Sequence, residues 1–229
     1  MSPGNLEGHL TPLGSLTEMT KFYVNGNKIS GTIPQSFFNM PKLQVLNLYD
    51  NHLRGSIPPI TSVNSRLMAL SLDDKRLEDG IPESLNKMKG FQSLTFSQSA
   101  FNGTTSSDLS DVNSLIDLYL DSNSLTGTIP STLRLLSNLR TLHLDNNKLS
   151  GTIPVLDQSS LMFIDLSVNY LTMGSLQEVP LSTFSPSALA MDIDLQSNCL
   201  VFRNPSKPSQ DVTATLCRGE KVCQNNCCS

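Results

Sequence analysis

The feature that most constrains this chain is a sequence pattern that returns every 24 residues. Four asparagines lie on that spacing, at Asn27, Asn51, Asn123 and Asn147. Apolar residues recur at fixed distances around each asparagine, and a glycine and an Ile-Pro pair follow it, so that a full copy reads LxxLxLxxNxLxGxIP. Such a period indicates a stack of similar units that share one linear core.

The copies differ in how well they keep the pattern. Lys75 and Ser99 stand at the asparagine position of two degraded copies, which still keep their apolar residues. Later copies, around Asn169 and Asn198, have irregular lengths. We therefore expect two regions: an array of about eight repeats over residues 1–203, the first incomplete, and a cysteine-bearing cap or tail over residues 204–229.

The spacing within one copy predicts its local structure. Leu142 and Leu144 alternate with Thr141, His143 and Asp145, which is typical of a short strand with one apolar face. Stacked copies would form a parallel sheet over a column of leucines, and the asparagine amide would bond backbone groups where the chain leaves the strand. Apolar residues three and six positions after each proline predict a short 3₁₀ or helical return segment.

These motifs resemble plant-type leucine-rich-repeat proteins, whose consensus contains the NxLxGxIP signature. The resemblance covers roughly residues 4–200 and implies an α/β solenoid, a curved horseshoe with a concave parallel sheet and short 3₁₀ or helical convex segments. Family members of known role are mostly ectodomains of receptor kinases and receptor-like proteins, or secreted inhibitors of cell-wall-degrading enzymes. The resemblance therefore implies protein or peptide recognition, since a solenoid is a scaffold that acts through its surface.

Charge and motifs exclude several function classes. The formal net charge of −4 argues against binding to a nucleic-acid backbone. No apolar run approaches the ~18 residues that a membrane span requires. The sequence also contains no G-x-S-x-G, no H-E-x-x-H and no glycine-rich phosphate loop. We therefore expect a non-enzymatic module with no cofactor, no nucleic-acid partner and no membrane span in this chain.

The candidate ligand-binding surface is the solvent-facing side of the predicted sheet. Tyrosines lie in its columns, and aspartates gather in the later repeats. This pattern favours a concave site for a protein or peptide that carries Lys or Arg. The alternative is that the aspartates only keep an exposed sheet soluble and that tyrosine is simply a good strand former. The candidate residues are Tyr23, Tyr49, Asp117, Tyr119, Asp121, His143, Asp145 and Asp165.

Two groups of residues deserve comparison with metal or catalytic sites. His143 lies near several aspartates on the predicted sheet, but a solvated histidine among acids is the favoured interpretation, and no metal site is predicted there. The tail sequence from Cys223 to Cys228 lacks a nearby histidine and the usual spacing of zinc ligands, so disulfide use is favoured over metal binding.

All five cysteines lie in the last 31 residues. By resemblance to the family, a disulfide between Cys199 and Cys217 would cap the end of the leucine column. The partners of Cys223, Cys227 and Cys228 stay open, and an odd count leaves one thiol over. These cysteines, with the glycosylation sequon at Asn102, favour an exported protein.

The N-terminus carries neither a signal peptide nor a complete first repeat, so we expect a fragment of a longer protein or a truncated gene product. The leading hypothesis is the extracellular ligand-binding part of a cell-surface receptor involved in signal transduction. The alternatives are a secreted inhibitor, a structural protein of the wall or matrix, or an intracellular scaffold, the last favoured if the cysteines are reduced.

Overall fold

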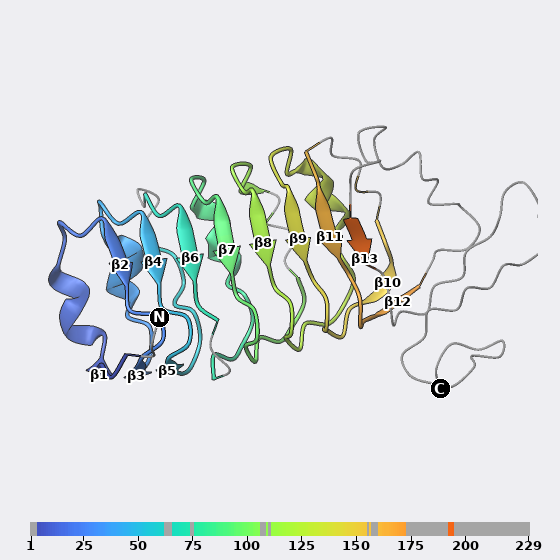
Figure 1. The fold of residues 1–229 in the computed structure, drawn as a ribbon. Coiled ribbons are helices and arrows are strands. Elements are labelled where there is room, and N and C mark those ends of the chain that lie inside the picture. The colour runs from blue at the N-terminus through green and yellow to red at the C-terminus, as the bar shows by residue number, and fades with distance from the viewer. Residues whose placement is uncertain are drawn as a thin grey trace, which may run out of the picture.

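A computed structural model of the 229-residue chain describes residues 4–61, 66–73, 76–105, 109, 111–154, 156, 160–172 and 192–194. Short strands lie side by side along one axis, with helical segments behind the main sheet (Figure 1). The main sheet has eight parallel strands among the described residues, in the order β13-β11-β9-β8-β7-β6-β4-β2. We call it the concave sheet, and the curved leucine-rich-repeat solenoid expected from the sequence is confirmed.

The strands are short because each repeat contributes only a few residues to each sheet. The concave sheet consists of β2 (Lys21–Tyr23), β4 (Val45–Asn47), β6 (Ala69–Ser71), β7 (Ser93–Thr95), β8 (Asp117–Tyr119), β9 (Thr141–His143), β11 (Phe163–Asp165) and β13 (Asp192–Asp194). Two smaller parallel sheets follow the asparagine positions and are formed by β1 (Glu7–His9), β3 (Lys28–Gly31) and β5 (His52–Leu53), and by β10 (Ser150–Thr152) and β12 (Tyr170–Thr172).

The core is a column of apolar side chains that runs through the stack. Equivalent residues of neighbouring strands are register partners, for example Leu118 with Leu142 and Leu142 with Ile164. Each is at most 1% exposed. The same column continues through Leu46, Leu70 and Leu94. Burial of one such side chain stabilises the fold by roughly 1.5–3 kcal/mol, which a single repeat could not gain alone.

The asparagine ladder predicted from the sequence is present. The Asn147 Nδ2 donates to the carbonyl oxygens of Leu144 (3.1 Å), Asp145 (3.1 Å) and Leu120 (2.9 Å). Its Oδ1 accepts the backbone N–H of Leu125 at 3.0 Å. Each asparagine therefore joins its own turn to the preceding repeat. The same pattern is made by Asn51, Asn123 and Asn169.

The turn before each asparagine requires a left-handed backbone. The non-glycine residues at this position have φ between 51° and 56°: Asp50, Gln98, Ser122, Asn146 and Val168. Aspartate and asparagine tolerate this conformation, whereas a β-branched residue is strained in it. Val168 is therefore a local sequence–structure conflict within an otherwise regular stack.

The return segments are 3₁₀ helices, as the threefold apolar spacing predicts. They are η1 (Thr11–Ser15), η2 (Gln35–Asn39), η3 (Glu83–Lys87) and η5 (Ser131–Leu135). Pro34, Pro82 and Pro130 immediately precede three of them, where the missing N–H breaks no ladder bond. Within the described segments, no helix has the length and apolar character of a bilayer span. The cap predicted over residues 204–229, with Cys199 and Cys217, lies outside the described residues.

Candidate functional site

The concave sheet presents two columns of side chains that cross the strands in parallel. Along each strand the middle residue points into the core, so its two neighbours lie on the open face. In β8, for example, Leu118 is buried while Asp117 and Tyr119 are partly exposed. The period of the repeat then places residues of like position side by side, at ~4.8 Å per strand.

One column is aromatic. The ring of His143 stacks on Tyr119, with ring centroids 4.7 Å apart and an interplanar angle of 20°. On its other side it stacks on Phe163, also at 4.7 Å, with an angle of 28°. The three rings come from β8, β9 and β11, which are neighbours in the sheet. The imidazole is thus held between two aromatic faces.

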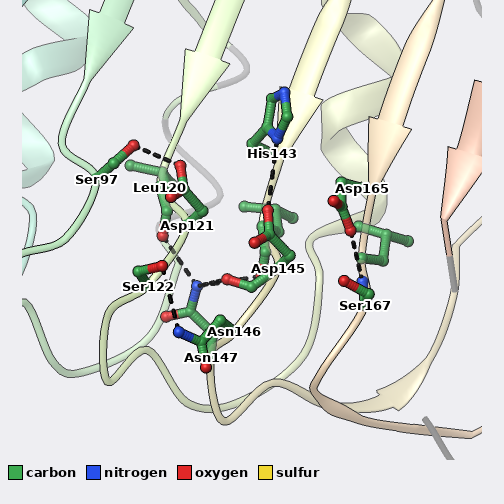
Figure 2. A network of polar contacts seen from close by, with 12 residues as sticks. Ser97, Leu120, Asp121, Ser122, His143, Asp145, Asn146, Asn147, Asp165 and Ser167 are labelled. Atoms are coloured by element: carbon green, nitrogen blue, oxygen red, sulfur yellow. Dashed lines mark hydrogen bonds and ion pairs between the residues drawn. The ribbon is translucent and has the colours of Figure 1, made fainter. Parts of the chain in front are cut away.

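The second column is acidic and begins where the strands end. Asp121 and Asp145 occupy it in two consecutive repeats, and Asp165, the register partner of His143 at the end of β11, lies beside Asp145 (Figure 2). We refer to these three aspartates together as the acidic column. The Asp165 Oδ1 accepts the backbone N–H of Ser167 at 2.9 Å. The Ser97 hydroxyl donates to Asp121 Oδ1. A hydrogen bond from its own turn orders Asp165, and a hydrogen bond from the preceding repeat orders Asp121.

Asp73 extends the acidic network toward the earlier repeats. Its Oδ1 accepts the backbone N–H of Ser97, and its Oδ2 accepts the Ser71 hydroxyl at 3.2 Å. Since Ser97 also contacts Asp121, the two carboxylates share one serine. The network thus connects carboxylates on either side of β7.

Burial and mutual repulsion perturb two of these acids. Burial raises the pKa of Asp73 to about 6; the negative charge of Asp121 adds to the rise, while the hydrogen bonds from Ser97 and Ser71 oppose it. The pKa of Asp145 is also raised, first by burial and then by the charges of Asp165 and Asp121. A cation on this face would relieve both perturbations, because an opposite charge favours the ionised carboxyl.

A hollow of about 390 Å³ opens on the concave sheet over β4, β6 and β7. Small side chains such as Ala69 and Ser93 leave the space, and Tyr49 and Asp73 lie at its border. The hollow is therefore continuous with the acidic network through Asp73.

The structure brings most of the predicted binding residues together, but not all. Tyr119, Asp121, His143, Asp145 and Asp165 form the two columns described above. The other three predicted residues lie elsewhere on the sheet. Asp117 lies at the opposite end of β8 from the acidic column, Tyr49 lies beside the hollow, and Tyr23 lies on β2 at the edge of the sheet. Tyr23 is 57% exposed and shares no contact with the columns.

Two members of the site are absent from the predicted set. Phe163 lies two positions earlier in its strand than His143 in its own, so the sequence pattern assigns it to a different column; the rings nonetheless meet diagonally across the sheet. Asp73 belongs to a degraded repeat, and only its column position, shared with Asp121 and Asp145, signals its role. The sequon residue Asn102 is exposed, as expected, and its modification stays a prediction.

Comparisons with known proteins identify the repeats. The Leucine Rich Repeat family model matches residues 18–40, 42–63, 114–136 and 138–158. A search of the curated proteins finds no match. Among solved structures, the ectodomain of the Arabidopsis thaliana receptor kinase GASSHO1/SCHENGEN3, in complex with CASPARIAN STRIP INTEGRITY FACTOR 2, has 35% identity and a TM-score of 0.79. The similarity covers 86% of this chain and 23% of that one.

Two other solved structures show the range of similar proteins. The ectodomain of the Arabidopsis receptor kinase HAESA, with an IDA peptide hormone, has 29% identity and a TM-score of 0.79. This similarity covers 94% of the present chain and 38% of the HAESA chain. A plant ice-binding protein has 25% identity and a TM-score of 0.74 over 85% of this chain and 62% of its own. The chain thus spans less than two thirds of each relative. The chain therefore contains leucine-rich repeats, and its repeats and fold are similar to those of plant receptor-kinase ectodomains.

Proposed function

We propose that this chain is a non-enzymatic recognition module whose concave sheet binds a peptide or protein segment carrying Lys or Arg. The observation that supports this most directly is the aromatic column of Tyr119, His143 and Phe163 lying beside the acidic column of Asp121, Asp145 and Asp165. An arginine fits both, since its planar guanidinium stacks on rings and pairs with carboxylates.

The energetics favour a cation at this place. A guanidinium over an aromatic face contributes roughly 0.5–2 kcal/mol, depending on how far it is desolvated. Asp145 and Asp73 are partly buried and carry raised pKa values, so the unliganded site holds unfavourable negative charge. A basic side chain would compensate that charge, and the same field would steer a cationic ligand toward the sheet.

The partner class and location follow from the relatives. The GASSHO1/SCHENGEN3 and HAESA ectodomains were solved with a named factor and a peptide hormone, respectively. By this similarity, the chain is proposed to be part of an extracellular, ligand-binding receptor region. The exposed sequon at Asn102 supports an exported protein. The test is to express the full transcript in plant cells and to compare the secreted protein with its Asn102→Gln variant. We expect the variant to carry one glycan fewer than the unchanged protein. An unglycosylated chain with reduced cysteines would instead favour the intracellular-scaffold alternative.

Ligand selection by the concave sheet can be tested with random short peptides displayed on phage. Panning against the full chain should enrich peptides rich in Lys or Arg. Binding of the enriched peptides, measured by fluorescence anisotropy, should weaken at least tenfold in a Tyr119→Ala, Asp121→Ala, Asp145→Ala triple variant, and should weaken as salt is raised.

The matched control is Asp111→Ala, which removes an exposed acid near Lys89, away from the acidic column. This variant should bind the enriched peptides as the unchanged protein does. Unchanged affinity of the triple variant, with its far-UV circular dichroism intact, would show that the two columns are not the binding surface.

A second candidate function is ice binding, favoured by a different face. A threonine follows the repeat glycine in three successive copies, and these threonines, Thr104, Thr128 and Thr152, are all exposed. A Cβ added at Gly151 would lie 2.8 Å from the Thr128 Cγ2, so the threonine methyl packs over the next repeat's glycine and is fixed there. The result is a rigid, regularly spaced row of hydroxyl and methyl groups, of a kind suited to ordering water.

Inhibition of ice recrystallisation distinguishes this candidate from the first. If the face binds ice, the full chain should slow crystal growth and Thr128→Arg should abolish the effect, whereas the triple variant of the concave sheet should keep it. Crystal growth equal to that in a matched albumin solution would exclude this second function and leave the first unaffected.

A further inference from the structure

Three side chains with metal-ligating atoms meet on the concave sheet. His143 of β9 and Asp165 of β11 are register partners, and Asp145 follows His143 by two residues, so all three project to the same face. Their candidate ligand atoms lie within 4.8 Å of one another. No other trio of histidine, cysteine or acidic residues within the described part of the chain meets this condition.

An unpaired oxygen lies at the centre of this trio. The Asp145 Oδ1 has essentially no solvent-exposed surface and no hydrogen-bond donor among the residues that the structure describes. Its nearest polar neighbour is the Nδ1 of His143, at 3.4 Å (Figure 2). That separation exceeds the usual range of an N–H···O hydrogen bond. A carboxylate oxygen shielded from water in this way costs free energy unless a cation compensates it.

The imidazole is preorganised by its neighbours. Stacking between Tyr119 and Phe163 fixes the plane of the His143 ring, and its Nδ1 faces Asp145. A ligand that is already held in place loses little conformational freedom when it binds. The stack therefore lowers the entropic cost of recruiting His143 as a ligand.

We propose that His143, Asp145 and Asp165 bind a divalent transition-metal ion of the zinc class, with water completing the coordination. Metal–ligand bonds of about 2.0–2.2 Å place two ligands of a tetrahedral ion about 3.3–3.6 Å apart. The 3.4 Å between Nδ1 and Oδ1 agrees with that spacing. Asp165 reaches the ion by rotation of its side chain from within 4.8 Å.

The ligand set also selects the metal. One imidazole with two carboxylates suits zinc and its first-row neighbours, whereas calcium and magnesium prefer oxygen ligands alone. Two aspartates balance the charge of a divalent ion, which removes the repulsion between Asp145 and Asp165. This site does not depend on the peptide-binding proposal, since it needs no ligand beyond the ion.

Zinc titration of the full chain, with its five cysteines alkylated so that thiolates cannot bind the ion, provides the test. Imidazole ¹H–¹⁵N spectra resolve the three histidines and contain their own controls, His9 and His52. We expect the His143 signals to move to saturation at one ion per chain while those of His9 and His52 stay in place. Unmoved His143 signals, or equal shifts of all three histidines, would overturn the site.

Variants separate the ligands from the fold. His143→Phe keeps the aromatic stack but removes the nitrogen, and Asp165→Asn keeps the shape but removes the charge; each should weaken zinc binding at least tenfold in calorimetry. His52→Phe on β5 should bind like the unchanged chain. Unweakened binding in both site variants would refute the proposal, and the histidine spectra decide the matter even if one variant fails to fold.

Discussion

Replacing Asn147 by alanine removes one fully bonded side chain of the asparagine ladder. The side chain is 6% exposed and contacts four backbone groups. All three carbonyls it serves keep another donor. Asn123 also bonds Leu120, Asn169 also bonds Leu144, and the backbone N–H of Ser122 also bonds Asp145. The N–H of Leu125 loses its side-chain acceptor and becomes the main loss.

The expected magnitude follows from these contacts. An unsatisfied buried N–H costs about 1–3 kcal/mol, and each lost net hydrogen bond about 0.5–1.5 kcal/mol. Because all three carbonyls remain bonded, we expect Asn147→Ala to lower the free energy of unfolding by roughly 2–4 kcal/mol. The loss falls on the junction between two repeats, so it weakens their stacking rather than one strand.

Urea unfolding followed by far-UV circular dichroism measures this loss. The matched control is Asn138→Ala, an exposed asparagine with one hydrogen bond to the carbonyl of Asn113, for which we expect a loss below about 0.5 kcal/mol. The converse change, Ser99→Asn, should stabilise a degraded repeat by supplying the missing amide. If Asn147→Ala and Asn138→Ala reduce stability equally, the ladder does not join the repeats as argued.

Two further predictions concern strain and charge. Val168→Asn should raise the free energy of unfolding by about 1 kcal/mol, because it removes a β-branched residue from a backbone with φ 53°. Asn146→Val should lower the free energy of unfolding by a similar amount. Chemical denaturation measures both changes, and a destabilising Val168→Asn would contradict the strain at this position. For Asp73, the folded-state pKa of about 6 exceeds the ordinary aspartate value of 3.8. Between these pH values the folded protein therefore binds more protons than the unfolded chain, and its stability falls as pH rises through them. Asp73→Asn should therefore increase stability at neutral pH by roughly 2–3 kcal/mol and flatten the pH profile of unfolding; an unchanged profile would contradict the assigned shift.

The local structure of the repeating unit can be predicted from the sequence alone. Alternation of Leu142 and Leu144 with polar neighbours assigns the inward and outward faces of a strand, and the recurring asparagine and proline assign its turn and its 3₁₀ return. These are local properties with periods of two or three residues, so they can be read from one copy. The regular period then gives the stack, because no copy can bury its leucines alone.

Contacts between residues of different repeats depend on tertiary packing. Diagonal packing across the in-register strands β9 and β11 sets Phe163 against His143, although the pattern places them in separate columns. Likewise, Ser97 joins Asp73 to Asp121, and burial removes the Asp145 Oδ1 from water. Side-chain direction, shielding and charge coupling depend on neighbours from adjacent turns of the solenoid. A pattern within one repeat fixes the face on which a residue lies, and packing between repeats fixes what that residue meets there.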